Sequence, residues 1–198
     1  NADPDAYGSA YAIRYLLKYI YKNVQIKIGV PDGMSKLATK GSKLYRSSTI
    51  EQPIISPLDL IVVVDTGHKE LLADWGSSVS SSEAIKVFID HHPLDESIKI
   101  LADHLVVDTS MSSACELVYK IFKAKKIPLK PRVAEVLLTG ILFDSHHLAL
   151  AGYDTIKSVK ELCENGASID SAKTILSSRR DRPEVIARLK SAKRVKIF

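Results

Sequence analysis

The chain has 198 residues, 45% hydrophobic and 26% charged, which is typical of a soluble globular protein of one domain or slightly more. Its two cysteines, Cys115 and Cys163, are too few for a disulfide framework or a cysteine-based zinc site, and no apolar run approaches the roughly 20 residues of a membrane span. A net charge of +5 favours anionic partners such as nucleotides, although a lysine-rich solvated surface explains it equally well. We expect a cytoplasmic protein without a membrane partner, and, because the chain opens on Asn1, further residues before it.

Helical and strand-like segments alternate along the chain. Apolar residues at helical spacing predict a helix over 10–21, and an alternating segment that ends at a Pro-Asp-Gly turn predicts a strand over 24–30. Runs rich in β-branched residues predict buried strands over 60–64, 86–89 and 104–107. The remaining predictions are irregular structure over 41–57, an exposed serine-rich loop over 76–83, and helices over 113–124, 132–143, 154–164 and 183–193. Alternating strands and helices indicate an α/β fold with a parallel sheet.

Acidic and imidazole side chains directly follow two of the predicted strands. Asp65 follows the run that ends at Val64, and Asp90, His91 and His92 follow the next run. In open α/β sheets the functional crevice lies outside the carboxyl ends of the strands. These side chains are therefore expected to meet at one edge of the sheet.

Three further aspartates can reach the same edge. Asp3 and Asp5 stand just before the first helix, and Asp144 closes the helical segment 132–143. Several carboxylates a few ångströms apart cannot all ionise unless cations neutralise them. Carboxylates with imidazole and without thiolate favour a hard-to-borderline divalent ion, with Mn²⁺ preferred and Mg²⁺ or Co²⁺ next.

Each of these residues also has a purely structural interpretation. An aspartate after a strand is common as a turn or capping residue, Asp3 and Asp5 can cap the first helix, and Asp144 can end one. Paired histidines after a strand are harder to explain as core residues, whereas His146 and His147 suit a solvated turn equally well. The metal hypothesis rests on the convergence of all these residues, since independent caps would not share one edge.

The motifs resemble those of the DHH phosphoesterases. The resemblance is carried by 1–10 (NADPDAYGSA), 64–67 (VDTG), 90–93 (DHHP) and 140–145 (GILFDS), in the family's order, together with the serine-rich segment 110–116. It implies a five-stranded, mainly parallel sheet flanked by helices and a site for two Mn²⁺ ions. It also implies that 1–180 form the catalytic domain and that the basic 181–198 form a helical linker toward a C-terminal substrate domain that this sequence lacks.

The resemblance also implies a role for each site residue. Asp3 would bind one metal ion and Asp5 the other, Asp65 would bridge them, and His91 and Asp144 would complete the second. His92 would contact the scissile phosphate, Asp90 would orient the histidines, and Ser113 and His147 would help to bind substrate.

Three departures from the family pattern bear on the site. The family's first motif begins with a histidine four residues before Asp3, a position that falls before Asn1, so the resemblance accounts for five of six ligands. Ser145 replaces a threonine, and an arginine common after the fourth motif is missing.

The leading functional prediction is a Mn²⁺-dependent phosphoesterase that hydrolyses short oligonucleotides, dinucleotides or the nucleotide pAp, as in the nanoRNase and pAp-phosphatase branch. A pyrophosphatase or exopolyphosphatase, a RecJ-like single-strand exonuclease, and a metal-free replication scaffold of the same fold are the alternatives. Nucleotides or short single-stranded nucleic acids would be the partners. A homodimer is compatible with the sequence, which does not specify the oligomeric state.

Overall fold

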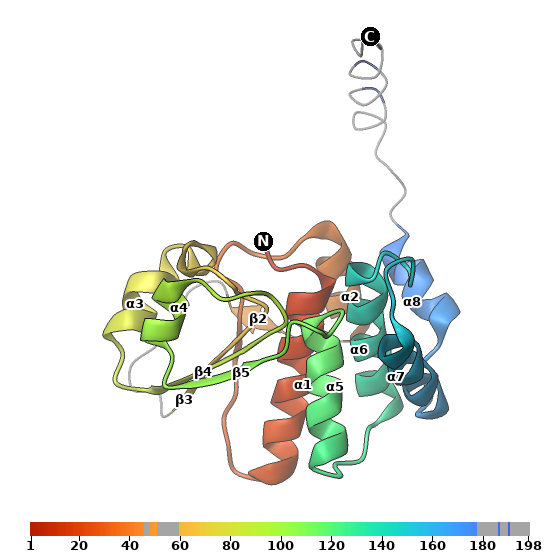
Figure 1. The fold of residues 1–198 in the computed structure, drawn as a ribbon, viewed down its shortest axis with the longest axis horizontal. Coiled ribbons are helices and arrows are strands. Elements are labelled where there is room, and N and C mark those ends of the chain that lie inside the picture. The colour runs from red at the N-terminus through yellow and green to blue at the C-terminus, as the bar shows by residue number, and fades with distance from the viewer. Residues whose placement is uncertain (46–47, 51–59, 178–185, 187–189, 191–198) are drawn as a thin grey trace.

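The computed structural model describes residues 1–45, 48–50, 60–177, 186 and 190. Helices and strands alternate along the first part of the chain and helices alone follow (Figure 1). The elements are α1 (Pro4–Ile20), β1 (Ile28–Gly29), α2 (Lys36–Tyr45), β2 (Thr49–Ile50), β3 (Leu60–Val64), the 3-10 helix η1 (Lys69–Leu72), α3 (Trp75–Ser81), β4 (Ile85–Asp90), α4 (Glu96–Leu101), β5 (His104–Val107), α5 (Ala114–Ala124), α6 (Pro131–Asp144), α7 (Tyr153–Glu164) and α8 (Ile169–Leu176). The predicted α/β class is confirmed.

Strands β3, β4 and β5 form one parallel sheet with β4 in the centre. Successive side chains of a strand point to opposite faces, and the two faces of this sheet are covered differently. Val62, Val64 and Ile89 contribute to the large core beneath α1, α5 and α6, whereas Val63 and Phe88 pack with residues of η1, α3 and α4. Burial on both faces explains why β3 and β4 read as continuous apolar runs. The strand over 104–107 was predicted to be buried, but β5 is an edge strand and is exposed along its length.

The five strands do not form the single sheet that was predicted. Strands β1 and β2 pair in parallel with each other, and none of the described strands hydrogen-bonds both β1 and β3. A cavity of about 1420 Å³ lies between β1 and β3. Residues of α1, β1 and β3 line this cavity, and it reaches Asp3, Asp65 and His92. The predicted five parallel strands are therefore present, but the described residues pair them as two sheets, one of two strands and one of three.

Helix α6 lies at the centre of the helical layer. It packs against α1, α5, α7 and α8 (Figure 1), and nine of its residues are buried, including Leu137, Leu138 and Ile141. A helix that is apolar all round is stable only when other elements surround it. This packing fixes the end of α6, and with it Asp144, against the first turn of α1.

Three local predictions were wrong. The serine-rich stretch 76–83 is mostly helix α3, because Val79 is buried beside Leu72 and the Ser80 hydroxyl donates to the Gly76 carbonyl at 2.7 Å. Part of 41–57 belongs to α2 and β2, since α2 packs on α6 and α8 although its local signal is weak. Of the strand predicted over 24–30, only β1 pairs with another strand.

The helix predicted over 183–193 and the basic linker 181–198 lie outside the described residues apart from positions 186 and 190, so both stay predictions. None of the described helices combines the length and hydropathy that crossing a membrane requires.

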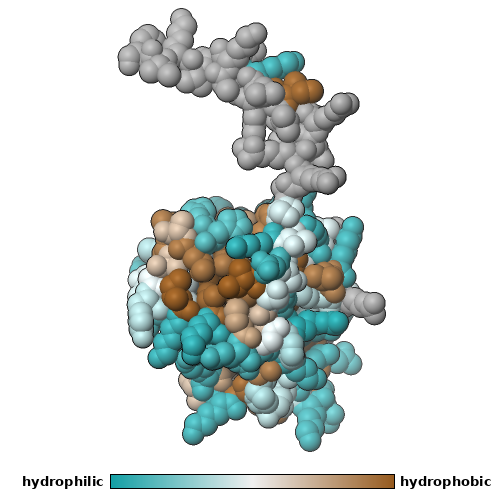
Figure 2. All heavy atoms as spheres, turned by 90° about the vertical axis from the view of Figure 1, so that its right-hand side faces the viewer, coloured by the Kyte–Doolittle hydropathy of each residue, from teal (hydrophilic) through white to brown (hydrophobic). Residues whose placement is uncertain are grey.

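On the side of the molecule that carries α7 and α8, hydrophobic residues gather in one area surrounded by hydrophilic ones (Figure 2). The exposed apolar residues Leu150, Tyr153 and Ile156 belong to α7 and the loop before it.

Candidate metal centre

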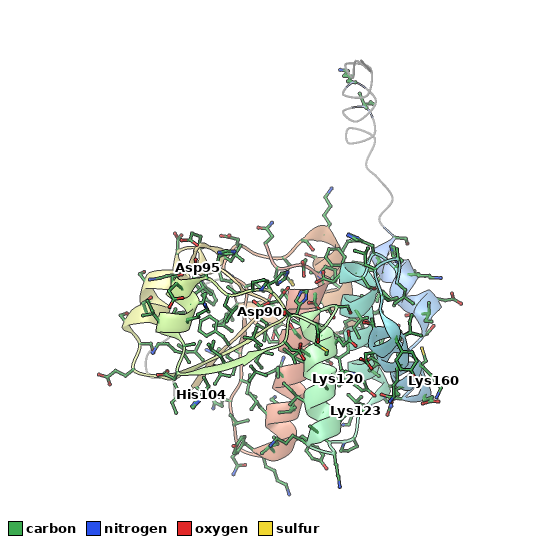
Figure 3. The ribbon with its side chains drawn as sticks, viewed as in Figure 1. Asp90, Asp95, His104, Lys120, Lys123 and Lys160 are labelled. Atoms are coloured by element: carbon green, nitrogen blue, oxygen red, sulfur yellow. The ribbon has the colours of Figure 1, made fainter. Side chains whose placement is uncertain are left out.

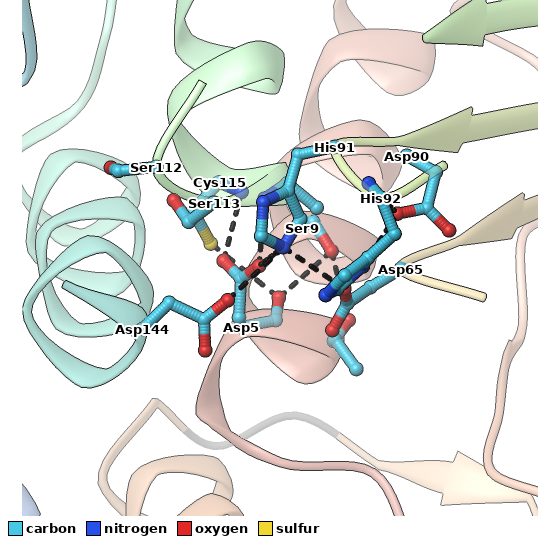
Figure 4. A network of polar contacts seen from close by, with 12 residues as sticks. Asp5, Ser9, Asp65, Asp90, His91, His92, Ser112, Ser113, Cys115 and Asp144 are labelled. Carbon is cyan, nitrogen blue, oxygen red and sulfur yellow. Dashed lines mark hydrogen bonds and ion pairs between the residues drawn. The ribbon is translucent and has the colours of Figure 1, made fainter. Parts of the chain in front are cut away.

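Polar side chains at the ends of four helices and strands lie close together at one site. Asp5 stands in the first turn of α1, Asp65 follows β3, His91 follows β4, and Asp144 ends α6; we call these four residues the acidic cluster (Figure 4). Figure 3 shows Asp90, the last residue of β4, where the strands meet the helices, and His104 at the far end of β5. The predicted convergence at the carboxyl ends of β3 and β4 is therefore present in the structure.

His91 lies at the centre of the cluster. Its Nε2 atom is 3.1 Å from Asp144 Oδ2, 3.7 Å from Asp65 Oδ1 and 4.0 Å from Asp5 Oδ2. Ligand atoms that bind one divalent ion at about 2.1 Å lie roughly 3 Å apart, so small shifts would let these atoms share an ion. Its Nδ1 atom faces the Met111 carbonyl at 3.4 Å, which favours the tautomer that leaves Nε2 without a proton.

Asp5 is fully buried against the start of α5. Its two carboxylate oxygens accept hydrogen bonds from the backbone amides of Ala114, at 2.7 Å, and Cys115, at 2.9 Å. Burial, followed by the charge of Asp144, nevertheless raises the pKa of Asp5 to about 7. A bound cation would reverse both effects, because it compensates for lost solvation and screens the neighbouring carboxylate.

Asp65 occupies a strained and desolvated position. Its φ of 52° lies in the left-handed region, which aspartate tolerates better than most residues. Burial, followed by repulsion from Asp5 and Asp3, raises its pKa to about 9. Backbone strain and a strongly shifted pKa at one residue are features that cluster at functional sites.

Three buried polar atoms at the site make no well-aligned hydrogen bond to the described residues: Asp65 Oδ1, Asp90 Oδ2 and His91 Nε2, the last of which has only the ion-pair contact with Asp144 at 3.1 Å. Buried polar atoms are rarely left unpaired in native proteins, and a missing ion is one of the few explanations. Two groups of side chains have ligand atoms close enough to hold an ion, Asp65–Asp90–His91–His92 and Asp5–His91–Asp144. The residues thus fit a divalent cation, and His91 belongs to both groups.

His92 sits at the edge of the cluster with its side chain 53% exposed. Its Nδ1 atom is 2.9 Å from Asp90 Oδ1, and its backbone amide donates to the same oxygen at 2.8 Å. Asp90, which is 1% exposed, therefore orients His92 at two points. Held in this way, the imidazole ring of His92 presents its Nε2 atom to a molecule that binds at the site.

The other predicted site residues are placed differently. Asp3 caps α1, accepting from the amides of Asp5 and Ala6, and it belongs to neither metal-ligand group; burial raises its pKa. Ser113 is buried as the N-cap of α5 and accepts from the Glu116 amide. The exposed His147 stands in a turn in which it and both neighbours have positive φ. Metal binding by Asp3 and substrate binding by Ser113 and His147 stay predictions.

Sequence reasoning missed the close approach of α6 to the cluster at Gly140. A β-carbon at this position would lie 2.4 Å from Cys115 Sγ and 2.8 Å from Asp5 Oδ1. We expect Gly140→Ala to destabilise the fold by roughly 1–3 kcal/mol, because the surrounding core cannot move away. Gly76→Ala is the control, since its β-carbon would meet nothing nearer than 3.7 Å in a helix that favours alanine. Urea unfolding of both variants checks this, and equal stability of the two would contradict it.

An α/β fold with this cluster at its strand ends defines the class of protein. The chain matches the model of the DHH family, N-terminal domain, over residues 1–141, and it belongs to this family of phosphoesterases. The acid and imidazole residues at the site have ligand atoms close enough to hold a metal ion, and the family depends on metal.

Two curated proteins are similar to the chain. It is 29% identical over its whole length to an uncharacterised protein of Methanocaldococcus jannaschii, of which it covers 58%. It is 31% identical over 147 residues to the bifunctional oligoribonuclease and PAP phosphatase NrnA of Bacillus subtilis, an alignment covering 72% of this chain and 43% of that protein. The chain thus spans about half the length of these relatives.

Solved structures share the fold. An exopolyphosphatase-related protein from Bacteroides fragilis superposes with a TM-score of 0.85 at 16% identity, over the whole of this chain and 59% of the other. A putative family II inorganic pyrophosphatase of Methanococcus jannaschii gives a TM-score of 0.63 at 19% identity, over 88% of this chain and 58% of the other. At these identities the likeness supports the architecture and not a shared substrate.

Proposed function

We propose that this chain is the catalytic part of a Mn²⁺-dependent phosphoesterase that hydrolyses short oligonucleotides, dinucleotides or pAp. The observation that carries the proposal is the set of unpaired buried atoms on Asp65, Asp90 and His91, beside the half-exposed ring of His92. The similarity to a bifunctional oligoribonuclease and PAP phosphatase favours nucleotide substrates over inorganic ones.

The acidic cluster would hold the metal, with Asp3 as a further ligand and Asp65 shared between two ions. Divalent ions at such a site supply Lewis acidity and a water that ionises near neutral pH. Asp5 and Asp65, whose raised pKa values reflect burial and mutual repulsion, would be ionised when a cation is bound. The choice of Mn²⁺ rests on the mixed carboxylate and imidazole donors.

His92 would bind the phosphate and stabilise the charge that develops on it. Its ring can donate from Nε2 when protonated, and the Asp90 carboxylate, 2.9 Å from Nδ1, fixes the orientation of the ring. Removing one such donor typically lowers turnover by about 10²–10³-fold. The exposed His147 is a further candidate for a contact with nucleotide phosphates.

A substrate panel tests the proposal. Assayed with Mn²⁺, the protein should hydrolyse pAp or di- to pentanucleotides faster than pyrophosphate or single-stranded DNA. His92→Gln should lower the rate by about 10²–10³-fold, whereas His104→Gln, at the far end of β5, should not. Turnover of pyrophosphate alone would refute the nucleotide assignment, and absence of both metal binding and turnover would favour the scaffold alternative.

A further inference from the structure

Glu116 is a buried carboxylate outside the acidic cluster. It stands in the first turn of α5 and is 1% exposed. Its Oε2 atom accepts from the Ser112 amide at 3.1 Å, the Ser112 hydroxyl at 2.8 Å and the Thr155 hydroxyl at 2.9 Å, and its Oε1 atom lies 2.9 Å from Ser158 Oγ. All of these partners are neutral groups.

These hydrogen bonds join two parts of the chain that are distant in sequence. Thr155 and Ser158 belong to α7 and are themselves buried, whereas Ser112 belongs to the loop between β5 and α5. A buried carboxylate is costly unless hydrogen bonds replace its hydration, and here four donors surround it. The Glu116 carboxylate therefore holds Ser112 at two atoms and anchors this loop to α7.

The loop that Glu116 holds and the first turn of α5, which follows it directly, contact two members of the acidic cluster. On one side of Ser112, the Met111 carbonyl faces His91 Nδ1 at 3.4 Å. On the other side, the amides of Ala114 and Cys115 donate to the two oxygens of Asp5. The position of Ser112 thus affects the groups that orient both Asp5 and His91.

We propose that Glu116 is a positioning residue of the metal centre, acting through the segment 111–115 on Asp5 and His91. The inference rests on the proposed function only in requiring that the acidic cluster binds a divalent ion. Glu116 itself does not touch the ion or the substrate. Groups that orient metal ligands through hydrogen bonds typically change metal affinity by about 10–100-fold when they are removed.

Two substitutions at Glu116 separate its acceptor role from its charge. Glu116→Met keeps the volume and removes every acceptor, so the dissociation constant for Mn²⁺ should rise by about 10–100-fold. Glu116→Gln should stay within about threefold of the natural protein, because its carbonyl can accept from Ser112 and Thr155 while its amide donates to Ser158. Mn²⁺ binding is measured by calorimetry or by electron paramagnetic resonance of the free ion.

Glu161→Met is the matched control. Glu161 also links α5 and α7, through Tyr119 and Lys123 at 2.6 Å each, but it lies at the other end of these helices. This variant should lower thermal stability and leave Mn²⁺ affinity within about twofold. In the metal-free protein, hydrogen exchange of the amides 112–115 should accelerate at least about tenfold in Glu116→Met and not in Glu161→Met.

A double-mutant cycle with Ser112 guards against a variant that does not fold. Ser112→Ala removes one of the two donors on this residue and should weaken Mn²⁺ binding less than Glu116→Met. The double variant should bind no more weakly than Glu116→Met alone, because both changes remove the same hydrogen bond. If Glu116→Met does not fold, the proposal would be overturned by a Ser112→Ala variant that binds Mn²⁺ as tightly as the natural protein does.

The remaining outcomes are equally decisive. The positioning role would be overturned if folded Glu116→Met bound Mn²⁺ as tightly as the natural protein. It would also be overturned if Glu116→Gln or Glu161→Met weakened Mn²⁺ binding as much as Glu116→Met does. Failure of the natural protein to bind Mn²⁺ would instead refute the proposed function. The two failures are therefore distinguishable.

Discussion

Replacing Asp65 with asparagine should lower phosphoester hydrolysis by about 10²–10³-fold or more and at the same time stabilise the metal-free protein at neutral pH. The loss of activity is expected because, in the proposed function, the Asp65 carboxylate would bind both metal ions. The gain in stability is expected because burial, followed by repulsion from Asp5, Asp3 and Asp144, raises the pKa of Asp65 to about 9. Asparagine tolerates the positive φ of this position.

The experiment compares turnover and urea unfolding of Asp65→Asn with those of Asp95→Asn. Asp95 is exposed and caps α4 through the Ser97 amide, a bond that asparagine also makes, so this control should change neither quantity appreciably. Retained turnover in Asp65→Asn would refute its role at the metal centre. A loss of stability would refute the repulsion that we infer.

The second large effect concerns pH. In the metal-free protein the free energy of unfolding should fall by at least about 3 kcal/mol between pH 4 and pH 9. The folded-state pKa is raised from 3.8 to about 7 for Asp5 and to about 9 for Asp65, so the folded state binds these protons more tightly than the unfolded state. Their stabilising contribution is complete below pH 3.8 and is lost as pH rises through 7 and then 9.

His91 acts in the same direction. Burial alone lowers its pKa, but the carboxylates of Asp144 and Asp5 outweigh burial and raise it, so its contribution is also lost on the alkaline side. At the acidic end, the lowered pKa values of Asp95, Asp108 and Glu161 oppose the trend, since their contributions are lost as pH falls below the usual carboxyl range.

Adding Mn²⁺ should remove most of this pH dependence, because the ion replaces the protons that relieve repulsion. At a concentration 100 times its dissociation constant, the ion should raise the free energy of unfolding by about 2.7 kcal/mol at neutral pH. Thermal unfolding with Mn²⁺ and with chelator, from pH 4 to 9, measures both effects. Stability that rises toward pH 9 without metal would contradict the shifted pKa values.

The agreement between sequence and structure is closest for the strands of the main sheet. The strands predicted over 60–64 and 104–107 are the observed β3 and β5, because runs rich in β-branched residues favour extended structure, although β5 is exposed and not buried as predicted. The meeting of Asp65 with His91 follows from the same strands, since parallel neighbours end at one edge. Asp144 could be placed only near the end of a predicted helix.

The segments that were predicted wrongly owe their structure to distant contacts. Helix α3 contains four serines, and burial of Val79 against η1 and β4 outweighs their weak helix propensity. Helix α2 depends in the same way on α6 and α8. The split between the two sheets also could not be read from strand patterns, which do not say which edges pair.

By itself, the sequence determined the α/β class, three strands of the main sheet, and the residue types that gather at its edge, because periodicity and strand ends are local properties. Only the tertiary structure decided how those residues are held. It placed Asp5 on the amides that begin α5, and it connected Glu116 to Thr155 and Ser158 of α7. These contacts join residues as many as 110 positions apart in sequence, and no local pattern specifies them.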